Sequence, residues 1–462
     1  MTDKRGPQFQ RTLTLLPLVV LGLAYMAPMT VFNTYGVVAQ KTHGMVPAAY
    51  VVALTAMLFT AYSYGNMARD YPLAGSAYTY TQKSISSHLG FLVGWAVLLD
   101  YLFLPMINFL LAGIFLSAAF PSIPSSVWII GFIMVITAIN TFGIRMTATV
   151  NGVLVLFQFL VTAIFLVLAV KGLTQGMGTG ALFSALPFFN PDVSFSFVLS
   201  GASILCLSFL GFDAVTTLSE EAVDPKKTVP KAIFLVALIG GALFAFVSYI
   251  TQLVYPHYDS FKVVDSAAFE IAEYIGGALF SAVFLAGIIT STIASGMSSH
   301  ASASRLLFAM GRESMLPKKI FGYVHPKYKT PSRNILFIGL LSLTALIMDL
   351  TTAASFINFG ALVAFTFVNV SVIFHYYIHK KERGLKETFQ YLLFPLIGAG
   401  FTIWLWTNLD VKSITLGSIW VIIGLVYLAF LTKFFTKEPP QFDFDESEHS
   451  NKETGEEINV TS

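Results

Sequence analysis

Long apolar runs recur along the whole chain, and they constrain the fold more than any other feature. A run of about 18 or more apolar residues is long enough to cross the hydrocarbon layer as a helix. A helix is favoured there because its backbone polar groups are satisfied within the segment. Charged residues make up only 11% of the chain, whereas soluble domains carry about 25%. We therefore expect an all-α polytopic membrane protein.

Twelve segments are expected to cross the membrane. Their ranges are 13–39, 46–68, 89–119, 125–142, 150–171, 196–221, 230–255, 275–309, 333–349, 353–378, 390–409 and 414–436. An even number of crossings places both termini on one side. With the N-terminus in the cytoplasm, 23 of the 27 Lys and Arg residues fall in cytoplasmic segments, as the positive-inside rule requires. The sequence predicts a multi-pass protein of the plasma (inner) membrane with both termini cytoplasmic.

The segments outside the spans offer no soluble catalytic domain. Residues 1–12 are expected to form a short cytoplasmic tail, and the acidic, almost non-apolar residues 437–462 are typical of a disordered cytoplasmic tail. The first span is too long for a signal-peptide core. Cys206 is the single cysteine, so a disulfide framework is excluded. Since no Walker loop, Cys/His metal spacing or nucleophile elbow is present, we expect no enzyme, metal or cofactor, and no nucleic-acid partner.

The sixth expected span carries a charge and a weak point at its middle. Asp213 lies within the apolar run, two residues after Gly211. A carboxylate at that depth costs at least about 2.5 kcal/mol, so it is tolerated only beside a partner or a cavity. Glycine weakens the helix at the same place. This combination is typical of the midplane binding site of a transporter.

The first expected span has a second weak point at Pro28. A proline within a helix removes one backbone donor and blocks a carbonyl, so the helix is expected to kink or open there. An ordinary proline kink is common in membrane helices and remains an alternative. Breaks near Pro28 and Gly211, five spans apart, are together typical of an inverted repeat with crossed discontinuous helices.

Asp100 is a third unusual residue in mid-span. It lies about ten residues, or about 15 Å, past the start of the third span, near the middle of a hydrocarbon layer about 30 Å thick. Tyr101 and Asn108 supply polar neighbours. Two interpretations stay open: a structural acid capped by a tyrosine of a neighbouring helix, or a cation or proton site.

Other polar residues are candidates for gating or coupling, each with an ordinary alternative. Gln158 is expected to bond between helices, and the hydroxyls of the eighth span, Ser291 and Ser295 among them, either line a cavity or allow close packing. Glu220 and Glu221 end the sixth span as a solvated boundary or as a gate ion pair with Arg69 or Arg305. The segment 69–83 is either a connecting surface loop or a re-entrant segment that closes a gate. His300 is expected at the membrane interface.

Three motifs resemble the amino acid–polyamine–organocation transporter superfamily. They are the sixth-span stretch 209–221 with 224–226 and 230–233, the loop 72–80, and the stretch 304–313 with Leu316 and Pro317. The similarity runs over essentially all twelve spans. It implies a five-plus-five inverted repeat of 13–171 and 196–378, two further helices in 390–436, and a substrate between broken first and sixth helices.

Within that superfamily, the stretches 22–33, 99–108 and 356–365 are most similar to bacterial putrescine importers. The resemblance implies a secondary active transporter that imports a small cationic amine by alternating access, with proton coupling left open. The alternative is an amino-acid permease that works as a symporter or exchanger. A sensor on the same scaffold is a third interpretation. The implied substrate contacts are Tyr25, Pro28, Met29, Thr30, Asp100, Tyr101, Phe209, Gly211, Phe212 and Asp213.

Two departures from the superfamily pattern bear on the substrate and on coupling. Pro28-Met29-Thr30 stands where typical amino-acid members have a glycine-rich break whose N–H groups hold the substrate carboxylate. Because proline has no N–H, this favours a substrate without a carboxylate. Gln158 stands where some proton-coupled members have a lysine, and it cannot titrate as that lysine does. Two amines need two negative ends, for which Asp100 and Asp213 are the candidates.

Overall fold

The computed structural model describes residues 13–72, 76–143, 148–219, 222–312, 315–328 and 330–439. Within these ranges the regular structure is helical, apart from one isolated bridge between Leu13 and Ala222. Ten helical segments are long and apolar enough to cross a membrane, and Ser125–Thr141 and Ser332–Leu346 are shorter apolar helices. Each predicted span overlaps one of these segments, although the eighth begins at Val264 rather than at residue 275, and this overlap confirms the all-α polytopic fold. The tails at 1–12 and 440–462 lie outside the described residues.

The helices of the first five spans follow the chain in order. They are α1 (Leu15–Met26), α2 (Thr30–Asn33), α3 (Tyr35–Lys41), α4 (Val46–Asp70), α6 (Ser87–Ala119), α7 (Ser125–Thr141) and α8 (Ala148–Thr174), with α5 (Ser76–Ser84) between α4 and α6. The first span is thus divided into α1, α2 and α3. Pro105 is accommodated inside α6.

The remaining spans are continuous in the described residues except for the sixth, which is interrupted at residues 210–212. The sixth span consists of α9 (Phe195–Leu205), η1 (Cys206–Phe209) and η2 (Asp213–Leu218), and the seventh and eighth spans are α10 (Pro225–Val254) and α11 (Ala267–Arg312). The ninth span is α13 (Ser332–Ser342) with η4 (Leu343–Leu346), and the tenth is α14 (Leu350–Val372) with η5 (Ile373–His379). The eleventh is formed by α15 (Leu385–Thr388), η6 (Phe389–Leu393) and α16 (Phe394–Thr407), and the twelfth is α17 (Val411–Leu431). Short turns η3 (Val264–Ser266) and α12 (Lys318–Phe321) lie in the connections. Helix α11 bends at Gly277, where φ is 66°.

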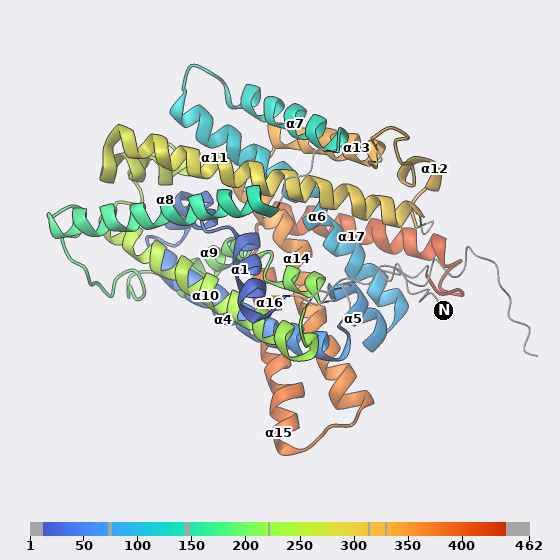
Figure 1. Cartoon of the computed structure of the whole chain (residues 1–462). Helices are drawn as coiled ribbons and strands as arrows, with labels where there is room; N and C mark the ends of the chain where they lie inside the picture. Colours follow the sequence, from blue (N-terminus) through green and yellow to red (C-terminus); the bar gives the residue numbers. More distant parts are fainter. Residues whose placement is uncertain are drawn as a thin grey trace, which may run out of the picture.

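The long helices run from one end of the molecule to the other and enclose the broken spans (Figure 1). Helix α6 packs against α7, α11, α14 and α17, and α4 packs against α10, α14 and α16. Helix α1 packs against α10 and η2 and lies near the centre of the view. The two broken spans are therefore in contact with one another inside a shell of continuous helices.

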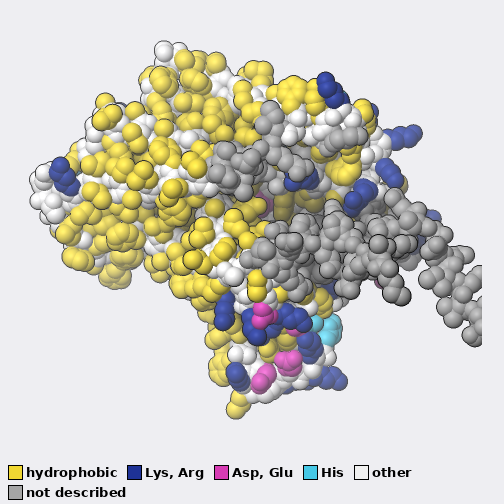
Figure 2. All heavy atoms as spheres, viewed as in Figure 1, with side chains coloured by type: hydrophobic (Ala, Val, Ile, Leu, Met, Phe, Trp, Pro, Cys, Tyr) yellow, Lys and Arg dark blue, Asp and Glu magenta, His cyan; other side chains and the backbone are white. Residues whose placement is uncertain are grey.

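The connecting segments gather at two ends, as alternate crossings require. We call one end the basic end: it holds residues 69–72, 141–143, 222–227, 315–328, 380–388 and 432–437. There the Thr330 hydroxyl donates to the Thr141 carbonyl over 2.9 Å, and Lys380 pairs with Asp70. At the opposite end the Thr179 N–H donates to the Leu253 carbonyl over 3.0 Å. Figure 2 shows hydrophobic side chains over most of the left of the view, whereas Lys and Arg gather at its right and lower margins.

The segment between the second and third spans is a buried helix rather than a surface loop. Ala77, Tyr80 and Thr81 of α5 are at most 1% exposed, and α5 packs against α6 and α14. A Cβ at Gly94 of α6 would lie 2.9 Å from the Tyr78 ring, so glycine allows the two helices to approach closely. The connecting-loop alternative for this segment is wrong within its described part. A role in gating stays a prediction.

His300 is fully buried between helices, so the prediction of an interfacial position is wrong. Its Nδ1 lies 3.3 Å from the Asn140 amide nitrogen, and its Nε2 lies 3.5 Å from the Thr137 hydroxyl. Both partners belong to α7, whereas His300 belongs to α11. The neighbouring helix supplies the hydrogen-bond partners that water would supply at an interface, and a buried polar side chain requires such partners.

Candidate functional site

The first span opens at the predicted place. Helix α1 ends at Met26, Ala27 has a φ of 53°, and α2 begins at Thr30. A positive φ is uncommon for alanine, and it turns the chain out of the helix directly before Pro28. The Thr30 hydroxyl donates to the Met26 carbonyl over 2.9 Å, which satisfies an acceptor at the helix end. Met29 is fully buried, with its sulfur 3.4 Å from the Thr162 hydroxyl.

The sixth span opens at Gly211. This residue has a φ of 109°, a conformation that only glycine adopts without strain. The chain is in tight helical turns on both sides, and η2 begins at Asp213. A Cβ placed on Gly211 would lie 3.1 Å from the Tyr25 Cβ and 3.3 Å from the Tyr25 carbonyl carbon. The break in the sixth span therefore lies directly against the end of α1.

Asp213 is held at this break by its own backbone and by a tyrosine. Its carboxylate forms hydrogen bonds with backbone groups of Gly211, Asp213 and Ala214 and with the Tyr64 side chain. Tyr64 on α4 is 1% exposed, and its ring meets the Phe212 ring edge-on at 5.7 Å. Tyr80 on α5 is within electrostatic range of the same carboxylate. Since buried residues of α4 and α5 flank it, the half-buried Asp213 faces the protein interior rather than lipid.

Asp100 on α6 is within electrostatic range of Asp213. Its Oδ1 is buried and has no hydrogen-bond partner among the described residues. Tyr101 is within electrostatic range of both acids and of Tyr25. A tyrosine cap on Asp100, one of the two interpretations left open, is thus not seen in the described part of the chain. A buried carboxylate oxygen without a donor is unfavourable, and it leaves an acceptor available to a ligand.

The two acids share one region without a resident countercharge. No Lys or Arg of the described residues lies in the middle of a span. Tyr25 is 58% exposed although it touches the sixth-span break, so this region is open to the outside of the protein beside α1. Two carboxylates at this depth are costly unless a cation joins them. The arrangement suits a ligand with positive charges and an apolar body that contacts tyrosine rings.

The two phenylalanines of the sixth span lie in packed surroundings. Phe212 and Phe209 are both fully buried. The Phe212 ring lies 5.3 Å from the Phe365 ring of α14, whereas the Phe209 ring lies 6.1 Å from the Phe244 ring of α10. Phe209 therefore supports the break from the α10 side. The predicted substrate contacts of both residues remain predictions.

The candidate gating and coupling residues do not form one cluster. Gln158 is 1% exposed, and its Oε1 has no partner among the described residues. Ser295 accepts a hydrogen bond of 3.0 Å from the Asn108 amide, which joins α11 to α6, and Ser291 is buried one turn earlier. Arg69 and Arg305 are exposed at the basic end. Glu220 and Glu221 lie outside the described residues, so the gate ion pair stays a prediction.

Tyr64 and Tyr80 were not foreseen as part of the site. Tyr80 belongs to the loop motif at 72–80. That motif was a signal for Tyr80, but it does not show that the segment packs against the sixth span. Tyr64 carries no comparable signal, since it lies in an ordinary polar stretch of α4. Two cavities at the surface, of about 380 and 590 Å³, do not include either central acid.

Comparison with known proteins extends over nearly the whole chain. The amino acid permease family matches residues 18–436. The chain is 48% identical over 437 residues to the low-affinity putrescine importer PlaP of Escherichia coli (strain K12), which covers 94% of this chain and 97% of that protein. It is 28% identical to the methylthioribose transporter of Bacillus subtilis (strain 168), over 93% and 95% of the two chains. The branched-chain amino acid permease BcaP of the same bacterium is also 28% identical, over 90% and 92%.

These matches confirm the resemblance found in the motifs. The family match at 18–436 includes both broken spans and both central acids. The extent of these matches leaves no room for a separate domain of another kind within 18–436. Together with the ten long apolar helices, they establish that this chain is a multi-pass membrane protein that belongs to the amino acid permease family.

Proposed function

We propose that the chain is a secondary active transporter that imports putrescine, or a similarly small organic diamine, across the plasma (inner) membrane. The observation that carries the proposal is the pair Asp100 and Asp213, two acids in mid-span within electrostatic range of each other and without a countercharge. The relative that is 48% identical is named a putrescine importer. The basic end faces the cytoplasm, as the positive-inside rule requires.

The two acids would take the two ends of a diamine. An extended four-carbon chain holds its ammonium groups too far apart for one carboxylate to serve both. The unpartnered Oδ1 of Asp100 accepts from one ammonium, and Asp213 at the helix break accepts from the other. Tyr25 and Tyr101 lie beside the pair, and an ammonium over an aromatic face adds about 0.5–2 kcal/mol per contact.

The backbone at the first-span break supports a substrate without a carboxylate. The Ala27 N–H already donates to the Ala24 carbonyl over 3.3 Å, and the Thr30 N–H donates to the Ala27 carbonyl over 3.0 Å. Pro28 between them has no N–H. Few backbone donors remain at this break to hold an anionic group. An amino acid would therefore gain less here than a diamine.

An amino-acid permease is the second candidate function. It is favoured by the description of the family and by the branched-chain permease among the relatives. The acid pair argues against it, because a neutral amino acid carries one ammonium for two carboxylates. A competition between substrates separates the two functions.

Alternating access would occur around the two breaks. The contact between Gly211 and Tyr25 supports the predicted relation between the two five-span halves, 13–171 and 196–378, because each half contributes one broken helix. The membrane potential drives a dication inward at about 2.3 kcal/mol per charge per 100 mV, so the potential contributes to import whichever ion is coupled to it. Proton coupling, if present, would not use Gln158, since an amide does not titrate.

Uptake into liposomes tests the proposal directly. With purified protein and an inside-negative potassium diffusion potential, labelled putrescine is expected to accumulate several-fold above liposomes without protein, and labelled leucine is not. Collapsing the potential is expected to reduce putrescine accumulation strongly, because two charges move with each molecule. Accumulation of leucine without putrescine would instead assign the amino-acid function.

A further inference from the structure

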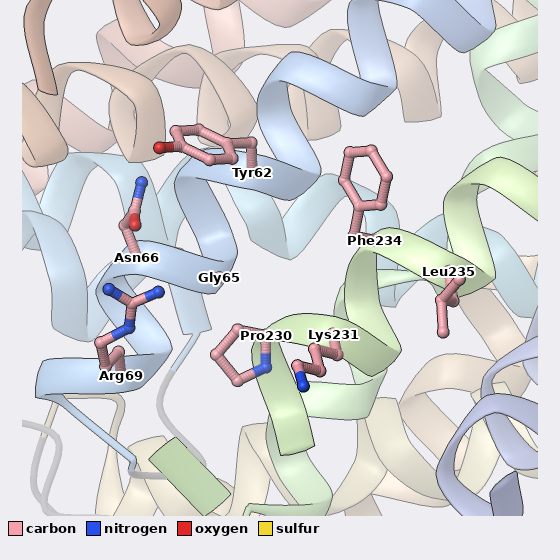
Figure 3. Close-up of a pocket in the computed structure, with 8 residues that line it drawn as sticks. All are labelled: Tyr62, Gly65, Asn66, Arg69, Pro230, Lys231, Phe234 and Leu235. Carbon is pink, nitrogen blue, oxygen red and sulfur yellow. The ribbon is translucent and has the colours of Figure 1, made fainter. Parts of the chain in front are cut away.

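A cavity of about 380 Å³ lies between the basic ends of α4 and α10, away from the two acids. Its lining residues are Tyr62, Gly65, Asn66 and Arg69 of α4 and Pro230, Lys231, Phe234 and Leu235 of α10. Figure 3 shows these side chains on the two facing helices. A Cβ at Gly65 would lie 3.2 Å from the Pro230 Cβ, so the two helices touch at the floor of the cavity.

Both charged groups of this cavity are cations, and the Tyr62 hydroxyl and the Asn66 amide add hydrogen-bond donors. Arg69 and Lys231 are exposed and form no ion pair with a described residue, and no Asp or Glu lines the cavity. A positive pocket excludes the cationic substrate proposed above and favours an anion. Helix α10 begins nearby at Pro225, and the positive end of its dipole adds to the same field.

Asn66 supplies an independent sign of a ligand. The side chain is only 3% exposed, and its Nδ2 has no hydrogen-bond partner among the described residues. It lies within interaction range of the Tyr62 hydroxyl. Figure 3 shows the Tyr62 hydroxyl, the Asn66 amide and the Arg69 guanidinium following one another along one side of α4. Because buried amide donors are nearly always satisfied, an unpaired donor in the lining of a cavity that also holds two cations points to an oxygen-rich anion.

An apolar track leads from the charged pocket toward the middle of the membrane. Phe234 and Leu238 follow Lys231 at three- and seven-residue spacing and are each 37% exposed, so they lie on one face of α10. The neighbouring Ala232, Ile233 and Val236 are fully buried against the protein. Seven residues of helix cover about 10 Å, which is a substantial part of one leaflet.

We propose that this cavity binds one anionic phospholipid, with its phosphate at Arg69, Lys231 and Asn66 and one acyl chain along Phe234 and Leu238. Basic pockets between helices at the cytoplasmic side are suited to lipid phosphates, and Arg69 is the penultimate residue of a span. The assignment of this lipid to the cytoplasmic leaflet rests on the orientation given under Proposed function. The binding of the lipid to the cavity does not depend on that orientation. A lipid here would hold α4 and α10 together, and α10 packs on α1 beside the substrate region.

Native mass spectrometry of the detergent-solubilised protein tests the proposal. With equal amounts of dioleoyl phosphatidylglycerol and dioleoyl phosphatidylcholine, the unmodified protein is expected to retain one tightly held phosphatidylglycerol. The double variant Arg69→Gln/Lys231→Gln is expected to retain it about thirtyfold more weakly, and each single variant about fivefold more weakly. Lys226→Gln, an exposed charge of the same helix end outside the cavity, is expected to match the unmodified protein.

A comparison of two ligands by their effect on the apparent melting temperature distinguishes a lipid site from a site for a soluble anion. Free sn-glycerol 3-phosphate, added without anionic lipid, is expected not to raise the apparent melting temperature, whereas phosphatidylglycerol raises it by a few degrees. If glycerol 3-phosphate stabilises the protein equally, the site takes a soluble anion and the lipid proposal is wrong. Equal retention of phosphatidylcholine, or undiminished retention by the single variants, would also overturn it. If the double variant does not fold, the retention of phosphatidylglycerol by the two single variants provides the test.

Discussion

Replacing Asp213 by asparagine is expected to lower putrescine uptake at least about a hundredfold. Breaking a buried ion pair by removing one partner costs about 3–5 kcal/mol, and each 1.4 kcal/mol is about tenfold. Asparagine keeps the shape of the side chain and an acceptor oxygen for the Tyr64 hydroxyl and the backbone at the break. The variant is therefore expected to fold and to reach the membrane.

The control for this variant is Asp192→Asn, which changes an exposed acid outside the helices. It is expected to take up putrescine at the rate of the unmodified protein. Uptake is compared at equal amounts of protein in the membrane, measured by immunoblot. If Asp213→Asn transports within about twofold of the control, Asp213 does not hold the substrate ammonium, and the proposed site loses one of its two ends.

Replacing Gly211 by valine is expected to abolish uptake and to lower stability. The φ of 109° at this position is strained for any residue with a Cβ, at about 1–3 kcal/mol, and more for a β-branched side chain. The added atoms would also meet the Tyr25 Cβ and carbonyl carbon at 3.1–3.3 Å. Either the backbone at the break changes conformation or α1 moves away, and in both cases Asp213 leaves its position within electrostatic range of Asp100.

Gly400→Val on α16 is the matched control, because a Cβ at Gly400 would have nothing within 4 Å and the residue is exposed in a regular helix. It is expected to retain uptake and an apparent melting temperature close to that of the unmodified protein. The contrary result is Gly211→Val with normal uptake and a normal melting temperature. It would mean that the break in the sixth span is not needed for transport.

The general fold was predictable because the bilayer allows so few solutions. Apolar length and the placement of Lys and Arg are sufficient to locate the spans, and each of the twelve overlaps an apolar helix of the structure. The two breaks were also predictable, since Pro28 and Gly211 act through local backbone chemistry. Such effects depend on the residue itself and not on its distant neighbours.

Features that depend on packing between distant segments were not predictable. Helix α5 is buried because α6 and α14 cover it, and His300 is buried because α7 supplies Asn140 and Thr137. The contact of Tyr64 with Asp213 joins residues of the second and sixth spans. A single sequence gives the depth of each polar residue in the membrane but not which neighbour it faces.

Arg69 illustrates the same limit at the basic end. Its position at the end of a span suggested a gate partner for Glu220 or Glu221. The structure places it in the lining of a cavity shared with Lys231, Asn66 and Tyr62, and its ion pair with either glutamate stays a prediction. The partner helix, α10, is more than 150 residues further along the chain, so the pocket could not be seen in the sequence of α4 alone.

The central claim is that two acids recognise two amines, and competition against labelled putrescine uptake by the unmodified protein tests it most directly. The competitors are straight-chain diamines of three, four and five carbons, n-butylamine and leucine. The four-carbon diamine is expected to compete best, and n-butylamine at least about tenfold more weakly because it forfeits one charge-assisted hydrogen bond. Leucine is expected not to compete. If n-butylamine or leucine competes as well as unlabelled putrescine, the two-acid account of Asp100 and Asp213 is contradicted.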